Sequence, residues 1–241
     1  MFQATIPDIV TDQAEYTKAL SLSRLAYDLE NLLSPMLAAA LIAILTFDVL
    51  FLMNGLAFIL SASLVLSVTL PGRKDESHGE LFWTRVTKGT RIYLKTPRLK
   101  GLLALSMVVS SAGAMQIVNT VVYIQSYLGL AEEWVAIAFA AAGGGSMAAA
   151  LTLPGILRRV APRSCMLSGG FLLSVSVLAG SAMPGINSLI LLWFLMGIGM
   201  SMILTPAGRL LTQSSCEKDR PALFAAQFSL SHACWLITYP L

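Results

Sequence analysis

The chain has 241 residues, of which 56% are hydrophobic and only 12% are charged. Soluble domains carry about 25% charged residues, so the composition excludes an ordinary soluble protein and indicates a protein surrounded by lipid. The net charge of +3 is small, and nucleic acid is not expected as a partner.

Seven apolar segments approach the length of about 20 residues that a membrane-spanning helix needs. The fifth and sixth are separated by Met183-Pro184-Gly185-Ile186-Asn187, because Pro and Gly interrupt helices. The segments are residues 25–47, 49–70, 101–131, 134–157, 166–182, 188–205 and 221–241. We therefore predict an all-α fold, a polytopic transmembrane bundle of about seven spans.

The stretch 71–100 is the only long polar segment between apolar blocks, and it holds eight of the 16 Lys and Arg residues. It divides the chain into residues 1–70, with an N-terminal segment and two helices, the basic linker 71–100, and residues 101–241, with five helices. Apolar side chains alternate with basic ones in this linker. This pattern fits either a short amphipathic helix on an anionic membrane face or a solvated basic loop.

The basic residues all fall on one side when seven spans are threaded alternately through a membrane. Besides those of the linker, they are Lys18, Arg24, Arg158, Arg159, Arg163, Arg209, Lys218 and Arg220. The opposite turns hold only Asp48 and the pair Glu132-Glu133. The positive-inside rule therefore predicts that the N-terminus and the linker lie in the cytoplasm.

Charged residues in the first span are candidates for function, because ionisable groups are costly in lipid. Arg24 and Asp28 are four residues apart and share a helix face, so an ion pair at the cytoplasmic end is one reading. The other makes Asp28 or Glu30 a proton or cation site. Glu30 is the better candidate, because it lies deeper and has no basic residue at helical spacing.

A polar stripe marks the third span. Gln116, Asn119, Thr120 and Tyr123 recur at three and four residues and therefore share a face. Unpaired amides facing lipid are costly, so this face is expected to point to protein or to a water-filled cavity. Hydrogen bonding between helices and cavity lining both explain the pattern.

The last span carries His232, with Trp235 and Tyr239 at helical spacing on the same face. Histidine titrates near neutrality and can carry protons, although a hydrogen bond to a neighbouring helix also accounts for it. Cys234 points to another side of the helix, so a metal site is not expected. No hydrolase motif of the HExxH or GxSxG type is present, and we predict neither an enzyme nor a bound cofactor.

Three stretches together resemble the major facilitator superfamily of transporters. They are residues 2–70 (FQATIPDIV…ALSLSRLAYDLENLLSPMLAAAL), the basic linker, and residues 145–170 (GSMAAALTLPGILRRVAPRSCMLSGG). Ser34, Ala38 and Ala39 stand where drug-exporting members carry glycines. Arg158 stands where the family usually has an acidic residue, which argues against a charge relay there.

The resemblance implies a membrane transporter of small solutes that works by rocking of two halves, with a proton as coupling ion and efflux as direction. It aligns the chain with helices five to eleven of twelve in a bacterial inner membrane, and another chain could supply the remaining helices. It also favours cavity lining for the polar stripe of the third span. The alternative is a truncated fragment or a non-transporting membrane protein that acts as a scaffold.

Overall fold

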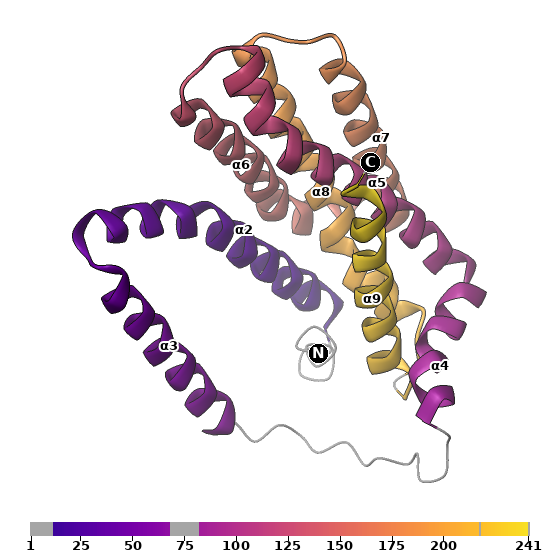
Figure 1. The fold of residues 1–241 in the computed structure, drawn as a ribbon. Coiled ribbons are helices and arrows are strands. Elements are labelled where there is room, and N and C mark those ends of the chain that lie inside the picture. Colours follow the sequence, from indigo (N-terminus) through magenta and orange to yellow (C-terminus); the bar gives the residue numbers. More distant parts are fainter. Residues whose placement is uncertain (1–11, 68–81, 217, 241) are drawn as a thin grey trace.

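The computed structural model describes residues 12–67, 82–216 and 218–240, and every regular element within them is a helix (Figure 1). The side chains of Gln13, Asp28, residues 31–40, 42–44 and 82–86 are outside this description. The elements are α2 Gln13–Ile44, α3 Phe47–Ser67, α4 Phe82–Lys95, α5 Pro97–Val121, the π-helical η1 Val122–Tyr127, α6 Glu132–Ile156, α7 Pro162–Gly180, α8 Ile186–Gln213 and α9 Arg220–Thr238.

Local sequence explains where several of these helices begin. The carboxylate of Asp12 accepts hydrogen bonds from the backbone of Ala14 and Glu15, both at 2.9 Å, and caps α2. A proline stands in the first turn of α5, α7 and α9, where its missing N–H leaves no helical bond unmade. The turn before α6 contains Gly129 at φ 65°, a conformation that glycine adopts without strain.

Helices α5 to α9 form one bundle, with α4 docked at its lower end in Figure 1. Helix α8 packs most extensively on α6 and α7 and also touches α2, α5 and α9. The interior is filled by large apolar side chains, including Leu102, Ile124, Leu173, Met196, Ile203 and Leu223. Burial of these side chains holds the five helices together through close packing.

Helix α2 lies along α6 in the opposite direction, while α3 stands apart from the bundle (Figure 1). Arg24 of α2 contacts Ser146 of α6. Lys18 precedes Arg24 in α2, and it lines a groove together with Pro154, which follows Ser146 in α6. The beginning of α2 and the end of α6 therefore lie at the same end of the molecule. Helix α3 has no buried residue.

The structure confirms the helical fold and refines the predicted segments. Five helices within the described residues are long and apolar enough to span a membrane. They are Phe47–Ser67, Pro97–Tyr127, Glu132–Ile156, Pro162–Gly180 and Ile186–Gln213. The spans predicted in α2 and α9 are not among them, and α9 contains the polar residues Gln227 and His232.

Helix boundaries differ from the prediction where polar residues continue a helix beyond its apolar core. Helix α2 starts at Gln13, before the predicted span 25–47, and α8 extends to Gln213, beyond the predicted end at residue 205. The predicted interruption at 183–187 is confirmed, because α7 ends at Gly180 and α8 begins at Ile186. The linker contains helix α4, so residues 82–95 are not an irregular loop.

The crossing of α6 and α8 requires glycine on both helices. A Cβ atom on Gly145 would clash with the backbone carbonyl of Phe194, and one on Gly197 would clash with the carbonyl of Ala142. Backbone atoms cannot move aside as the tip of a flexible side chain can. Small residues at such crossings let membrane helices approach closely and gain dispersion energy.

We predict that Gly145→Ala lowers the stability of the purified protein by about 1–3 kcal/mol, because the added methyl group overpacks the crossing. Thermal unfolding in detergent measures the effect. Gly144→Ala is the matched control, since its Cβ would meet only a Phe194 ring atom at 4.0 Å. The control should be neutral or gain up to about 1 kcal/mol of helix propensity. Equal melting temperatures for the two variants would contradict the proposed role of Gly145.

Candidate functional site

The polar face of α5 forms hydrogen bonds to α8 and to the turn that precedes it. Trp193 donates from Nε1 to the hydroxyl of Thr120 at 2.9 Å, and Thr120 donates to the carbonyl of Gln116. The hydroxyl of Tyr123 donates to the carbonyl of Pro184 at 2.8 Å. Two of the four predicted stripe residues, Thr120 and Tyr123, therefore connect helices through hydrogen bonds.

The other two members of the stripe behave differently. Gln116 is buried, and its amide nitrogen has no hydrogen-bond partner within the described part of the chain. Asn119 is exposed, so it does not share the buried face. A buried amide without a partner is unfavourable and marks a place where a polar ligand atom would be stabilised. Gln116 is thus the stripe residue with a donor still free for binding.

A polar network joins α4, α5 and α9 near the basic end of the bundle. The hydroxyl of Tyr93 donates to the side-chain carbonyl of Gln227, and the Gln227 amide donates to the hydroxyl of Ser106 at 3.3 Å. Tyr93 is fully buried, and this burial raises the pKa of its hydroxyl far above the usual value. Sequence reasoning did not select Tyr93 as a site residue, although the alternating linker pattern included it.

Helix α4 is fixed to the start of α9 by two further contacts. The ammonium group of Lys88 lies 3.0 Å from the carboxylate of Asp219, and both side chains are partly exposed. Gly89 lies so close to the carbonyl of Ala222 that no Cβ fits between them. Exposed ion pairs contribute at most about 1 kcal/mol, so the close packing and the buried network account for most of the docking. The packed face of α4 is therefore directed toward α9.

Arg24 connects α2 to α6. Its Nε and Nη2 atoms donate to the hydroxyl of Ser146 at 3.3 and 3.2 Å, and its guanidinium lies 5.1 Å from the centre of the Tyr27 ring. The sequence also suggested an ion pair between Arg24 and Asp28. The side chain of Asp28 is outside the part of the chain that the structure describes. Glu30 is exposed on α2.

Helix α2 also touches α8. The hydroxyl of Tyr16 lies 3.2 Å from the hydroxyl of Thr212, and Tyr16 packs beside Gly208. The three arginines predicted at the loop between the fourth and fifth spans, Arg158, Arg159 and Arg163, are exposed around the junction of α6 and α7. The beginning of α2, the end of α6 and the end of α8 thus meet at one basic end.

The predicted residues on α9 do not converge on a single point. His232 is exposed, and its Nδ1 lies 2.7 Å from the carbonyl of Phe228 one turn earlier in the same helix. Trp235 packs against Gly113 of α5, and Tyr239 is exposed beside the Trp235 ring. No cluster of metal-binding side chains occurs among the described residues.

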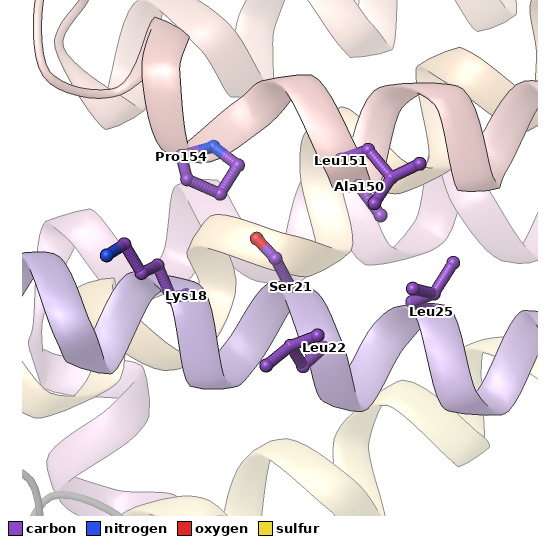
Figure 2. Close-up of a pocket in the computed structure, with 7 residues that line it drawn as sticks. All are labelled: Lys18, Ser21, Leu22, Leu25, Ala150, Leu151 and Pro154. Atoms are coloured by element: carbon purple, nitrogen blue, oxygen red, sulfur yellow. The ribbon is translucent and has the colours of Figure 1, made fainter.

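A groove of about 190 Å³ lies between α2 and α6 (Figure 2). Lys18, Ser21, Leu22 and Leu25 line it from α2. Ala150, Leu151 and Pro154 line it from α6. The sequence did not predict this groove, because it depends on how two helices distant in the chain pack together.

The family model described as Major Facilitator Superfamily matches residues 1–239. No curated protein matches the chain.

We predict that Tyr93→Phe destabilises the protein by about 0.5–1.5 kcal/mol, because Gln227 loses the hydroxyl that donates to it. Tyr127→Phe is the matched control, since Tyr127 is exposed at the end of η1. Thermal unfolding of the two purified variants measures the difference. If Tyr93→Phe has the same melting temperature as the unchanged protein, or if the control has a lower one than Tyr93→Phe, the network does not hold α4.

Proposed function

Since this chain belongs to the Major Facilitator Superfamily and is therefore a membrane transporter, we propose that it moves small solutes out of the cell in exchange for protons. In this proposal two groups of helices rock against each other around a central path, so that the path opens alternately to the two sides of the membrane. The interface between α2 and α6 is the boundary between the moving groups. The cell membrane of a bacterium is the proposed location, with the basic end of the bundle in the cytoplasm.

The contact between α2 and α6 is the observation that carries this proposal. It joins a helix before the polar segment 71–100 to a helix after it, so the two parts of the chain meet directly. Small side chains, Ser146, Ala149 and Ala150, lie on the side of α6 that faces α2, and Arg24 of α2 donates hydrogen bonds to Ser146. An interface lined by small side chains can slide or open without breaking a packed core.

The proposed numbering treats α2 and α3 as the fifth and sixth helices of a twelve-helix transporter and α5 to α9 as the seventh to eleventh. The absence of buried residues in α3 then has a physical explanation. An apolar helix with no buried residue fits a lobe in which further helices pack on one face and lipid covers the other. In this proposal another chain of the same assembly supplies those further helices.

The solute path is proposed to follow the polar residues of α5 and α9. The unpaired amide of Gln116 would bind a polar group of the solute, and the proposed path also includes Asn119 and the α9 residues His232, Trp235 and Tyr239. Asp28 and Glu30 on α2 are the proposed proton carriers. Ionisable groups within a membrane are rare and commonly belong to ion or proton pathways, which supports this role.

We predict that a cross-link between α2 and α6 stops transport, because the two helices can then no longer separate. Leu22→Cys and Leu151→Cys suit a short flexible bis-maleimide, since both leucines are 63% exposed and line one groove. Ethidium efflux from cells should fall to the level of cells without the protein. Cys216→Ser removes the exposed native thiol beforehand.

The matched control carries Leu151→Cys and Gly155→Cys, which lie one turn apart on α6 and cannot restrain α2. Full efflux in the cross-linked α2–α6 pair would refute rocking at this interface.

Collapse of the proton gradient should also stop ethidium efflux. Efflux that continues without the gradient would refute proton coupling. Unchanged efflux in the combined variant Glu30→Gln, Asn119→Ala and His232→Ala would exclude these residues from the path.

A further inference from the structure

The groove between α2 and α6 combines a polar end with apolar walls. Lys18 and Ser21 lie one turn apart on α2, while Leu25, Leu151 and Pro154 supply hydrocarbon surface (Figure 2). A closed cavity of about 150 Å³ accommodates a benzene molecule, so a volume of about 190 Å³ holds a small head group or a short piece of an acyl chain. The chemistry of the lining is therefore that of an amphiphile site.

Ser21 shows that this site lacks one polar contact. The residue is only 5% exposed, and its hydroxyl has no hydrogen-bond partner within the described residues. A helical serine commonly bonds the carbonyl four residues earlier, but this one does not. A buried hydroxyl without a partner is unfavourable, so an oxygen atom of a bound molecule would stabilise it. In Figure 2 its oxygen points from α2 toward α6, into the groove.

Lys18 gives the polar end of the groove a positive charge. Its side chain is exposed and extends from α2 beside Pro154 (Figure 2). Arg158 and Arg159 follow Pro154 by about one helical turn and are also exposed. The ammonium group and the serine hydroxyl together form a donor pair for an oxyanion, and the nearby arginines add to the positive potential.

We propose that this groove binds an anionic phospholipid from the membrane leaflet at the basic end of the bundle. The phosphate lies against Lys18 and Ser21, and the first methylenes of one acyl chain lie along Leu25, Leu151 and Pro154. Basic pockets between membrane helices on the cytoplasmic side bind lipid head groups in this way. The lipid fills the space between α2 and α6 and is a ligand of the interface, independent of which solute is transported.

Native mass spectrometry of the purified protein with phosphatidylglycerol or phosphatidylcholine tests this site. We expect phosphatidylglycerol to bind more tightly, and Lys18→Ala to weaken its binding about fivefold, the factor expected for one lysine at an anionic membrane surface. Ser21→Ala, combined with Lys18→Ala, should weaken phosphatidylglycerol binding further. Leu151→Trp should block binding, because the larger side chain fills the groove. Leu151 is exposed, so the fold should tolerate this change.

Lys100→Ala is the matched control, because Lys100 is an exposed lysine near the same basic end but outside the groove. Its phosphatidylglycerol affinity should equal that of the unchanged protein. Equal binding of the two lipids, an unchanged affinity in Lys18→Ala, or an equal loss in Lys100→Ala would overturn the proposal. Displacement of the lipid by equimolar glycerol phosphate would also overturn it, since the ligand would then be a soluble phosphate.

Discussion

Lipid offers no hydrogen-bond partner, and this constraint explains two buried polar contacts between helices of the bundle. Thr120 is buried against Trp193 of α8, and Gln227 is held between Tyr93 of α4 and Ser106 of α5. In both cases a polar group on one helix is satisfied by a different helix. The bonds therefore fix which faces meet, while apolar packing supplies most of the stabilisation.

The two groups of helix contacts have different physical characters. Within the bundle, α6 and α8 approach so closely at Gly145 and Gly197 that their backbones exclude a methyl group, which makes this crossing rigid. Between α2 and α6, the surface retains a groove and a buried hydroxyl without a partner. Close packing on one side of α6 and a groove on the other is the arrangement that the proposed moving interface requires.

Hydrophobic periodicity and helix-breaking residues were sufficient to predict the long helices, because both act on the local chain. The break at 183–187 follows from Pro184 and Gly185, and the polar stripe on α5 follows from spacing alone. The partners of these residues could not be predicted, since Trp193 and Gln227 meet α5 and α4 only through tertiary packing. Asn119 shows the limit of the method: spacing placed it on the stripe, but the packing of α5 leaves it exposed.

A transporter of the proposed orientation requires that the basic ends of the helices share one aqueous side. Glu132→Cys and Arg158→Cys, each in a Cys216→Ser background, place an exposed thiol at the beginning of α6 and just beyond its end and test this directly. The native Cys165 and Cys234 are buried. A membrane-impermeant thiol reagent on intact cells should label Glu132→Cys and should reach Arg158→Cys only after the cells are broken. Labelling of Arg158→Cys from outside intact cells would contradict the account.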